Sequence, residues 1–361
     1  HDRTTRSVIS TYSGQAKGFT DPQGIKYISY DRCGSATEQP IDTFDDVNMI
    51  PSSLVSHKRI LNEYTDPVAR KRGNATVSTV TEYKAASEIQ ANLVQQTVTT
   101  TTLFDVKGNA VDQTTNKSVA NAAGTLLLAN RTAVHNEGFD ARGNALTQEI
   151  TTSTTDDAGL NLEVTSYQVM TNRKFDGRKN VTNQMVYSYD ELGAPLLEVQ
   201  EIRSSNYKAS GVAGEQIIVT YTDANRSSII EAKKITNTNV NSVGNVGTSR
   251  IEIYSLADVA GADKDGAITL SGLTEMQVIT TSLVSGFDAR GNALSQTIDK
   301  TYYDDAGEAT DYETQAITND AFNIHDRTTR SVISTYSGQA KEFTDTQEIK
   351  DVSYDLYGNA T

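Results

Sequence analysis

The chain has 361 residues, a formal net charge of −14 and only 37% hydrophobic residues. Such an acidic surface repels phosphate backbones, which argues against nucleic acid as a partner. This low hydrophobic content favours a thin sheet of half-buried residues over a single large hydrophobic core. No apolar run approaches the roughly 20 residues that a membrane span needs.

The residue types argue for a folded β protein over a disordered chain. The 17 tyrosines and the recurrent Thr, Val and Ile are strand formers. Cys33 is the only cysteine, so the chain has no internal disulfide framework.

The first 37 residues return near the end of the chain. His1–Lys17 is identical to His325–Lys341, and the match continues with substitutions to Thr37 against Thr361, always displaced by 324 residues. Near identity over this length indicates tandem duplication. We therefore expect residues 1–361 to be one repeat array, about one 324-residue period of a longer chain.

Two stretches break the repeat pattern. Residues 32–68 carry three prolines, and proline cannot donate to a strand ladder. We expect an irregular insertion there, with a short helix over Ser56–Glu63. A second irregular insertion is expected near residues 256–275.

An eight-residue motif recurs along the chain. Phe139–Leu146 returns unchanged at Phe287–Leu294, with looser copies at Phe104–Ala110 and Tyr354–Ala360 and a degenerate one at Phe175. Asp can accept the amide two residues on, and Gly supplies a positive φ, so the motif predicts a tight turn with a bulge. The residues assigned to structural turns are Asp105, Gly108, Asn109, Asp140, Gly143, Asn144, Asp176, Asp288, Gly291, Asn292, Asp355, Gly358 and Asn359.

A second turn signal, Asp-x-x-Gly, lies between the motifs at residues 156–159, 190–193 and 304–307. Two turns in each period of about 36 residues indicate a β-hairpin unit. The predicted fold is therefore all-β. Tandem hairpins would form a continuous antiparallel sheet coiled into a tube, spiral or stalk.

Most predicted strands contain a Gln followed two residues later by an aliphatic residue. Neighbouring glutamines lie at equal distances in sequence on either side of a predicted turn. The midpoint between Gln184 and Gln200, for example, is Leu192. Facing amides can hydrogen-bond along a row that crosses the strands. The predicted structural ladder consists of Gln148, Gln168, Gln184, Gln200, Gln216, Gln277, Gln296 and Gln315.

The sequence contains few motifs that are typical of metal-binding or catalytic sites. Asp263 and Asp265 are similar to the middle of a calcium loop, but Gly261 and Gly272 occupy its first and twelfth ligand positions, which makes the pair weak calcium candidates. No two histidines have metal-ligand spacing, and the sequence has no nucleophile elbow, phosphate loop or Cys–His pair. We expect no metal, no cofactor and no enzymatic activity.

The aromatic-Asp-x-x-Gly-Asn motif resembles the YD repeats of Rhs and teneurin-type surface and toxin proteins. The residues that carry the resemblance are Tyr30-Asp31, Phe104-Asp105, Phe139-Asp140, Phe287-Asp288 and Tyr354-Asp355, with the Gly and, in all but the first, the Asn that follow. The resemblance implies antiparallel hairpins that spiral into hollow shells outside cells. The repeat in this chain is longer than the family's hairpin step.

These patterns lead us to expect a structural segment of a long extracellular or cell-surface fibre or tube, which provides attachment, reach and mechanical continuity. The alternatives are a carbohydrate-binding adhesin module and a YD-repeat shell that encloses a toxin. The expected partners are further copies of the repeat in the same chain or identical chains in a filament, and surface glycans. We expect neither nucleic acid nor a membrane span.

Overall fold

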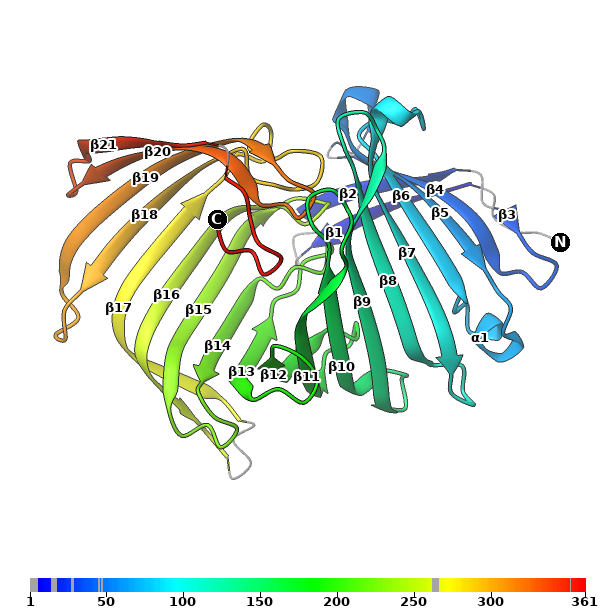
Figure 1. Ribbon diagram of the computed structural model, residues 1–361, viewed down its shortest axis with the longest axis horizontal. Coiled ribbons are helices and arrows are strands. Elements are labelled where there is room, and N and C mark those ends of the chain that lie inside the picture. Colours follow the sequence, from blue (N-terminus) through cyan, green and yellow to red (C-terminus); the bar gives the residue numbers. More distant parts are fainter. Residues whose placement is uncertain are drawn as a thin grey trace. The chain divides into compact units, whose positions relative to one another are not determined.

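In the computed structural model the chain is built almost wholly of antiparallel β-strands (Figure 1). The structure describes residues 6–13, 18–26, 29–44, 46, 48–261, 266–350 and 352–361, with side chains from residue 23 onward apart from residue 26. The predicted all-β fold of tandem hairpins is confirmed. Its coiling into a tube, spiral or stalk stays a prediction.

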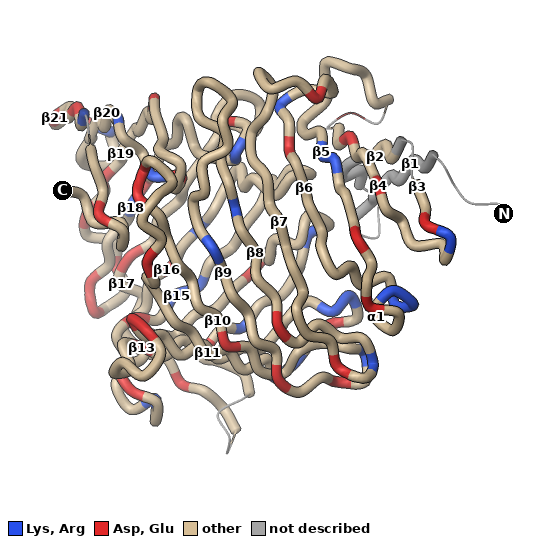
Figure 2. The backbone as a smooth tube through the Cα atoms, turned by 45° about the vertical axis from the view of Figure 1, so that its right-hand side comes forward, with Lys and Arg blue, Asp and Glu red and all other residues tan. Residues whose placement is uncertain are grey.

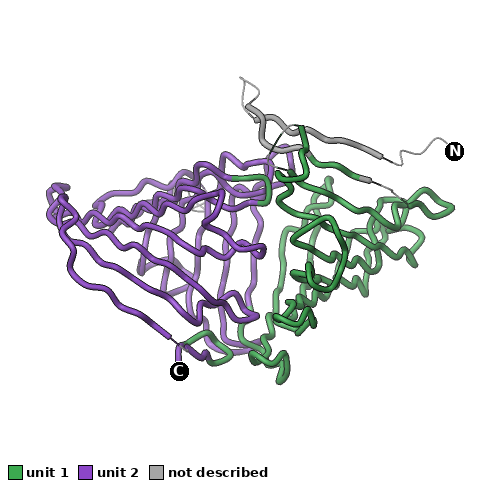
Figure 3. The backbone as a smooth tube through the Cα atoms, turned by 90° about the horizontal axis from the view of Figure 1, so that it is seen from above, with its two compact units in different colours: residues 1–167, 241–243, 355–359 green, residues 168–240, 244–354, 360–361 purple. Residues whose placement is uncertain are grey.

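The chain forms two compact units (Figure 3). The first comprises residues 1–167, 241–243 and 355–359, and the second comprises residues 168–240, 244–354 and 360–361. The chain first passes from one to the other within β11 (Glu163–Phe175).

In the first unit, β1 pairs with β2 and β2 with β4, and from β4 to β10 each strand pairs with its successor. The two-residue β3 also pairs with β4. The elements are β1 (Arg6–Ser13), β2 (Gly18–Lys26), β3 (Ser29–Tyr30), β4 (Ala36–Phe44), η1 (Pro51–Ser53), β5 (Leu54–Glu63), α1 (Pro67–Lys71), β6 (Val77–Tyr83), η2 (Gln90–Asn92), β7 (Leu93–Phe104), β8 (Ala110–Ala120), β9 (Leu126–Phe139) and β10 (Ala145–Thr154).

In the second unit, every strand from β12 to β20 pairs with its successor in antiparallel sense. The strands are β12 (Val181–Tyr189), β13 (Leu196–Ser205), β14 (Glu215–Tyr221), β15 (Ile229–Val240), β16 (Val246–Val259), β17 (Ile268–Thr280), β18 (Ser295–Tyr303), β19 (Ala309–Phe322), β20 (Thr328–Ser337) and β21 (Glu342–Ile349). Within the described ranges, no helix has the length and apolar character that a membrane span requires.

The irregular insertion predicted at residues 32–68 is wrong, because most of the segment forms β4 and β5. Residues 56–63, predicted as a short helix, belong to β5. Pro40 lies within β4, between the described residues of β4 that pair with β3 and those that pair with β2.

The irregular insertion predicted at residues 256–275 is also wrong. Its described residues extend the β16–β17 hairpin as far as the pair Val259 and Ile268, beyond a register shift at Tyr254. The extension carries alternating apolar residues, of which Ala257 and Leu270 pack against buried side chains of the second unit.

Most register shifts between paired strands lie at an aromatic residue, which in all cases but Tyr254 is at or next to a strand end. A bulge of this kind adds one residue to one strand and increases its twist. The aromatic residues at these shifts are Tyr12, Tyr30, Phe44, Tyr83, Phe104, Tyr189, Tyr221, Tyr254, Tyr303, Phe322 and Tyr336.

The observed strand registers overturn the predicted ladder of facing glutamines. Gln184 faces Ile202 and Gln200 faces Val186, because the turn residues and the bulge at Tyr189 displace the register from perfect symmetry. The same reciprocal Gln–Ile pairing joins β18 to β19.

The amides of the predicted ladder bond to other polar side chains instead. Gln148 donates to Asn136, Gln184 to Asn172 and Gln216 to Ser204, over 2.9 to 3.1 Å. In the remaining described cases, Gln168 donates to Ser188, Gln200 to Glu198, Gln277 to Glu275 and Gln315 to Glu313. No bond between two ladder glutamines is seen in the described part of the chain.

The second unit has a local core on one face of β12 to β15. Met185, Val199, Val219, Tyr221 and Ala232 are buried together, and the extended end of the β16–β17 hairpin covers them. These residues alternate with the Gln–Ile positions, so this core lies on the opposite face of the sheet from the glutamines.

Glu201 lies at the border of this core and is fully buried. Its Oε1 is 3.1 Å from Arg173 and 2.6 Å from Arg203, and its Oε2 is 2.8 Å from Arg226. Arg203 also donates to the carbonyl of Gly266. One carboxylate therefore connects β11, β13, the turn after β14 and the end of the β16–β17 hairpin.

Removal of this carboxylate should destabilise the protein strongly. Glu201→Ala leaves three mostly buried guanidinium groups without their shared partner, which should cost about 3–5 kcal/mol of unfolding free energy. The control Glu215→Ala removes a more exposed ion pair with Lys234, expected to contribute about 0–1 kcal/mol. Urea denaturation measures both, and equal losses would contradict the role given to Glu201.

Candidate functional site: stacked turns at the sheet edge

The motif turn at Asp140 satisfies its own polar groups. One carboxylate oxygen, Oδ1, accepts the amides of Arg142 and Asn144 at 2.8 and 2.9 Å, and Oδ2 accepts the Asn144 side-chain amide at 2.8 Å. Two backbone bonds close the loop, from Asp140 N to Asn144 O and from Gly143 N to Asp140 O. Gly143 has φ +79°, which L-residues avoid.

The other predicted turn residues adopt the same arrangement. Each Asp accepts the backbone amide four residues on at 2.8 to 2.9 Å and the side-chain amide of that Asn at 2.7 to 3.0 Å, at Asp105–Asn109, Asp176–Asn180, Asp288–Asn292 and Asp355–Asn359. Gly108, Gly291 and Gly358 all have positive φ.

Three turns at the other ends of the strands use the same backbone pattern, whereas the predicted turn at residues 190–193 closes with a bond from Ala194 N to Glu191 O. Asp156 and Asp304 accept the amides two and four residues on, as Asn121 does in a turn that sequence reasoning missed. The signal was present as Asn121-x-x-Gly124. The motif turns take their side-chain bond from the Asn at the fifth position, whereas in the Asp156 turn Asn161, at the sixth position, donates to Asp156 Oδ2 at 2.7 Å.

Hydrogen bonding to the charged form lowers the pKa of several turn carboxylates. For Asp140 the main cause is the backbone amide of Asn144, and for Asp176 it is the Asn180 side chain. The pKa of Asp105 and that of Asp355 are also lowered by their Asn partners.

In the first unit, consecutive motif turns contact one another along the sheet edge. Arg72, in the loop after α1, donates to Lys107 O at 2.7 Å and to Asn109 Oδ1 at 2.8 Å, and Asn74 donates to Gly108 O at 2.7 Å. Arg72-Gly73-Asn74 keeps only the second half of the motif, and α1 replaces the first half.

The second unit has a similar contact between turns. Arg290 donates to the carbonyl of Asn323 at 2.8 Å and lies 3.0 Å from the Asp326 carboxylate, while Asn292 donates to Asp326 at 3.1 Å. The turn residues thus have two roles, closing their own loop and bonding to the next turn.

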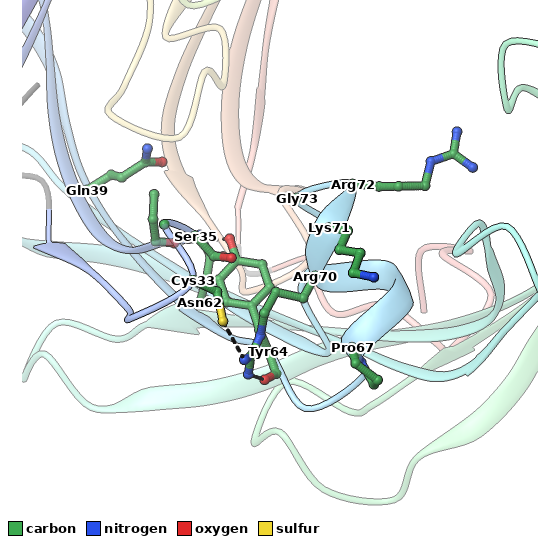
Figure 4. A pocket seen from close by; sticks show the side chains of 12 residues that line it. Cys33, Ser35, Gln39, Asn62, Tyr64, Pro67, Arg70, Lys71, Arg72 and Gly73 are labelled. Atoms are coloured by element: carbon green, nitrogen blue, oxygen red, sulfur yellow. Dashed lines mark hydrogen bonds between the residues drawn. The ribbon is translucent and has the colours of Figure 1, made fainter. Parts of the chain in front are cut away.

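Two pockets lie beside the turns of the first unit. One of about 960 Å³ is lined by Cys33, Asn62, Tyr64, Arg70 and Lys71, among others. Figure 4 shows Arg70 reaching towards Cys33 and Tyr64, whereas Arg72 points away from them. The basic run at α1 stands out in this acidic chain (Figure 2).

The second pocket, of about 490 Å³, is lined mainly by amide and hydroxyl groups. Its polar lining includes Asn62, Thr99, Gln113, Asn136 and Gln148. Such groups can exchange hydrogen bonds with polar ligands.

A buried histidine links three segments of the first unit. The Nδ1 atom of His57 is 2.5 Å from Asp42 Oδ1, and its Nε2 atom is 3.2 Å from Glu88 Oε1. The neighbouring Ser56 hydroxyl donates to Glu82, not to His57. Because carboxylates engage both ring nitrogens, the arrangement serves to connect β4, β5 and the segment before β7. Sequence reasoning did not single it out.

The weak calcium candidates Asp263 and Asp265 lie outside the described residues. Among the residues that the structure describes, no group of three or more His, Cys, Asp or Glu side chains is arranged to hold a metal ion.

Comparison with known proteins gives little further guidance. No family model and no curated protein matches the chain. A crystal structure of TcdB2–TccC3 without its hypervariable C-terminal region is similar over 98% of this chain and 22% of its own, at 12% identity and a TM-score of 0.18. A likeness this low does not establish a family, and the chain spans about a fifth of that protein.

Turn stacking should make Gly143 more sensitive to substitution than an isolated turn glycine. In Gly143→Ala the new Cβ would lie 2.8 Å from Asn109 Oδ1, in addition to the strain at positive φ. In Gly193→Ala the Cβ meets no atom within 4 Å, so only backbone strain of about 1–2 kcal/mol applies.

We expect Gly143→Ala to lose about 1–3 kcal/mol more unfolding free energy than Gly193→Ala, because of the added crowding. Thermal and urea denaturation of the two variants measure the difference. Equal losses would show that contact with the preceding turn does not constrain Gly143.

The lowered pKa of Asp140 predicts a pH-dependent contribution to stability. Its folded pKa lies below the ordinary value of 3.8, so its stabilisation is fully present above that value and is lost as the pH falls through the folded pKa. Asp140→Asn should therefore be less stable than the parent at pH 6, with the difference shrinking below pH 3.8.

Urea denaturation across this pH range measures the effect. Asp305→Asn, at an exposed position of another turn, reports the general effect of removing one negative charge. A difference between Asp140→Asn and the parent that persisted unchanged at low pH would contradict the assignment.

Proposed function

We propose that the chain is a structural segment of a long extracellular hairpin array that serves as a fibre. The observation that carries this proposal is the duplicated hairpin. Residues 1–37 and 325–361 have closely similar sequences, and the strands within them pair in the same register. A second copy of residues 1–37 after residue 324 would present to β19 the same strand sequence as β20, so the unit can propagate a sheet.

The turns support the same proposal. They satisfy their polar groups internally, and the contacts between successive turns hold neighbouring hairpins together. Repeat proteins derive their stability from such nearest-neighbour contacts. The acidic surface would help a long array to stay soluble. Location at the cell surface and service as a fibre are part of the proposal.

A two-period chain tests this function. In a chain of residues 1–324 followed directly by residues 1–361, the second copy of residues 1–37 takes the place of the first period's segment 325–361. Negative-stain microscopy and small-angle scattering should show a particle about twice as long with the same cross-section, since each period adds its own sheet.

A matched control replaces the second copy of residues 1–37, which joins the periods, with a flexible Gly/Ser linker of equal length. It should appear as two separate particles on a tether. Closed, rounded particles from the two-period chain would contradict the fibre and favour the alternative of an enclosing shell.

The pockets of the first unit favour a second candidate, a carbohydrate-binding module. The amide-lined pocket offers the donors and acceptors that sugar hydroxyls need, and it shares Asn62 with the larger pocket. A glycan array probed with the parent chain and with Gln113→Ala tests this idea. Binding that is lost in the variant supports a lectin role, and absence of any binding by the parent contradicts it.

A further inference from the structure

The two copies of the duplicated hairpin have the same backbone register. Ser7 faces Ile25 in β1–β2, and Ser331 faces Ile349 in β20–β21. Both copies shift register immediately before the equivalent tyrosines, Tyr12 and Tyr336. The pairing residues correspond throughout the shared range with a displacement of 324.

The two hairpins differ in their neighbours. The outer edge of β20 pairs with β19, where Ile333 faces Ile317. The outer edge of β2 pairs with β4, where Ile25 faces Ile41. Among the described strands, β1 pairs only with β2, and β21 only with β20. Each copy therefore shows one of two edge contacts that the same hairpin can make.

The strand that contacts β19 is identical in both copies. Thr328–Ser337 of β20 has the same sequence as Thr4–Ser13. The differences between the paired strands fall on the second strand, where Gly18, Pro22 and Gly24 of β2 correspond to Glu342, Thr346 and Glu348 of β21. The strand sequence with which β20 pairs with β19 is therefore present a second time, in β1.

The sequence differences between β2 and β21 determine which of the two strands is the better partner for β4. Gly24 of β2 faces Asp42 of β4. A β21 strand in this place would put Glu348 opposite Asp42, and like charges directly opposite destabilise a strand pair. All residues of β21 are exposed, and charge on an exposed edge discourages further pairing. β2 can continue into β4, whereas β21 is suited to end a sheet.

We propose that the β1–β2 hairpin of one molecule replaces β20–β21 on β19 of a second molecule, so that one sheet runs through β19, β1, β2 and β4 across two copies of this chain. The proposal rests on the proposed array function and names its partner. The exchange retains the identical first-strand pairing with β19. The contact joins different surfaces of the two copies, so it can repeat into an open filament.

Chain connectivity opposes the exchange, because each β19 has its own hairpin at high effective concentration. Refolding a concentrated mixture from urea gives both hairpins an equal opportunity to pair. Interchain cross-linking can then trap the exchanged form at one defined residue pair.

The test uses full-length chains that all carry Cys33→Ser. One chain carries Ile317→Cys and the other Ile9→Cys, at the position equivalent to Ile333. Directly opposite residues place their Cβ atoms about 4.5–5.5 Å apart, close to the reach of a disulfide. After joint refolding and mild oxidation, we expect covalent heterodimers.

The register control pairs Ile317→Cys with Val8→Cys, because the residue equivalent to Val8 faces Thr318 instead. It should yield several-fold fewer heterodimers. We expect light scattering to detect concentration-dependent oligomers of the Cys33→Ser parent. A second control, Ile317→Cys with Ile333→Cys in one chain, oxidises within the molecule and should abolish these oligomers.

Equal cross-linking at positions 8 and 9, or oligomers unaffected by the internal disulfide, would overturn the exchange. The two-period chain keeps the two proposals distinguishable. If it lengthens while cross-linking fails, this inference is wrong and the array function stands. If cross-linking succeeds while the two-period chain does not lengthen, the exchange stands and the fibre function is wrong.

Discussion

The capped turn is the interaction on which the rest of the structure depends. In each motif turn one carboxylate accepts two backbone amides and a side-chain amide, so a five-residue loop needs no help from solvent or from a deep core. This matters because the sheet is thin and its residues are mostly half-buried. The turns fix where each strand ends, and the aromatic bulges fix how far its register is displaced.

Much of the architecture could be predicted from the sequence because turn chemistry is local. Asp140, Gly143 and Asn144 specify their loop through bonds within five residues, and the structure places the equivalent positions of each motif in the same loop. The symmetric position of glutamines about the turns correctly indicated antiparallel hairpins. It could not give the register, because the spacing of residues along the chain does not show where a bulge adds an unpaired residue.

What sequence reasoning missed depends on contacts between distant residues. Glu201 meets Arg173 and Arg226 only because three segments converge, and no spacing pattern reveals such a meeting. His57 is brought between Asp42 and Glu88 in the same way. The insertion expected at residues 32–68 failed for a different reason, because its prolines were given too much weight. Pro40 lies within β4, and Pro51 and Pro67 lie outside β4 and β5.

The central claim is that capped turns and aromatic bulges together set the register of the hairpins. Cross-strand nuclear Overhauser effects in a deuterated, selectively labelled chain test it most directly at the β18–β19 hairpin, which has a turn capped by Asp304 and a bulge at Tyr303. The bulged register predicts contacts between the backbones of Gln296 and Ile317. A direct contact of Gln296 with Gln315 would show that the register is symmetric and would contradict the account.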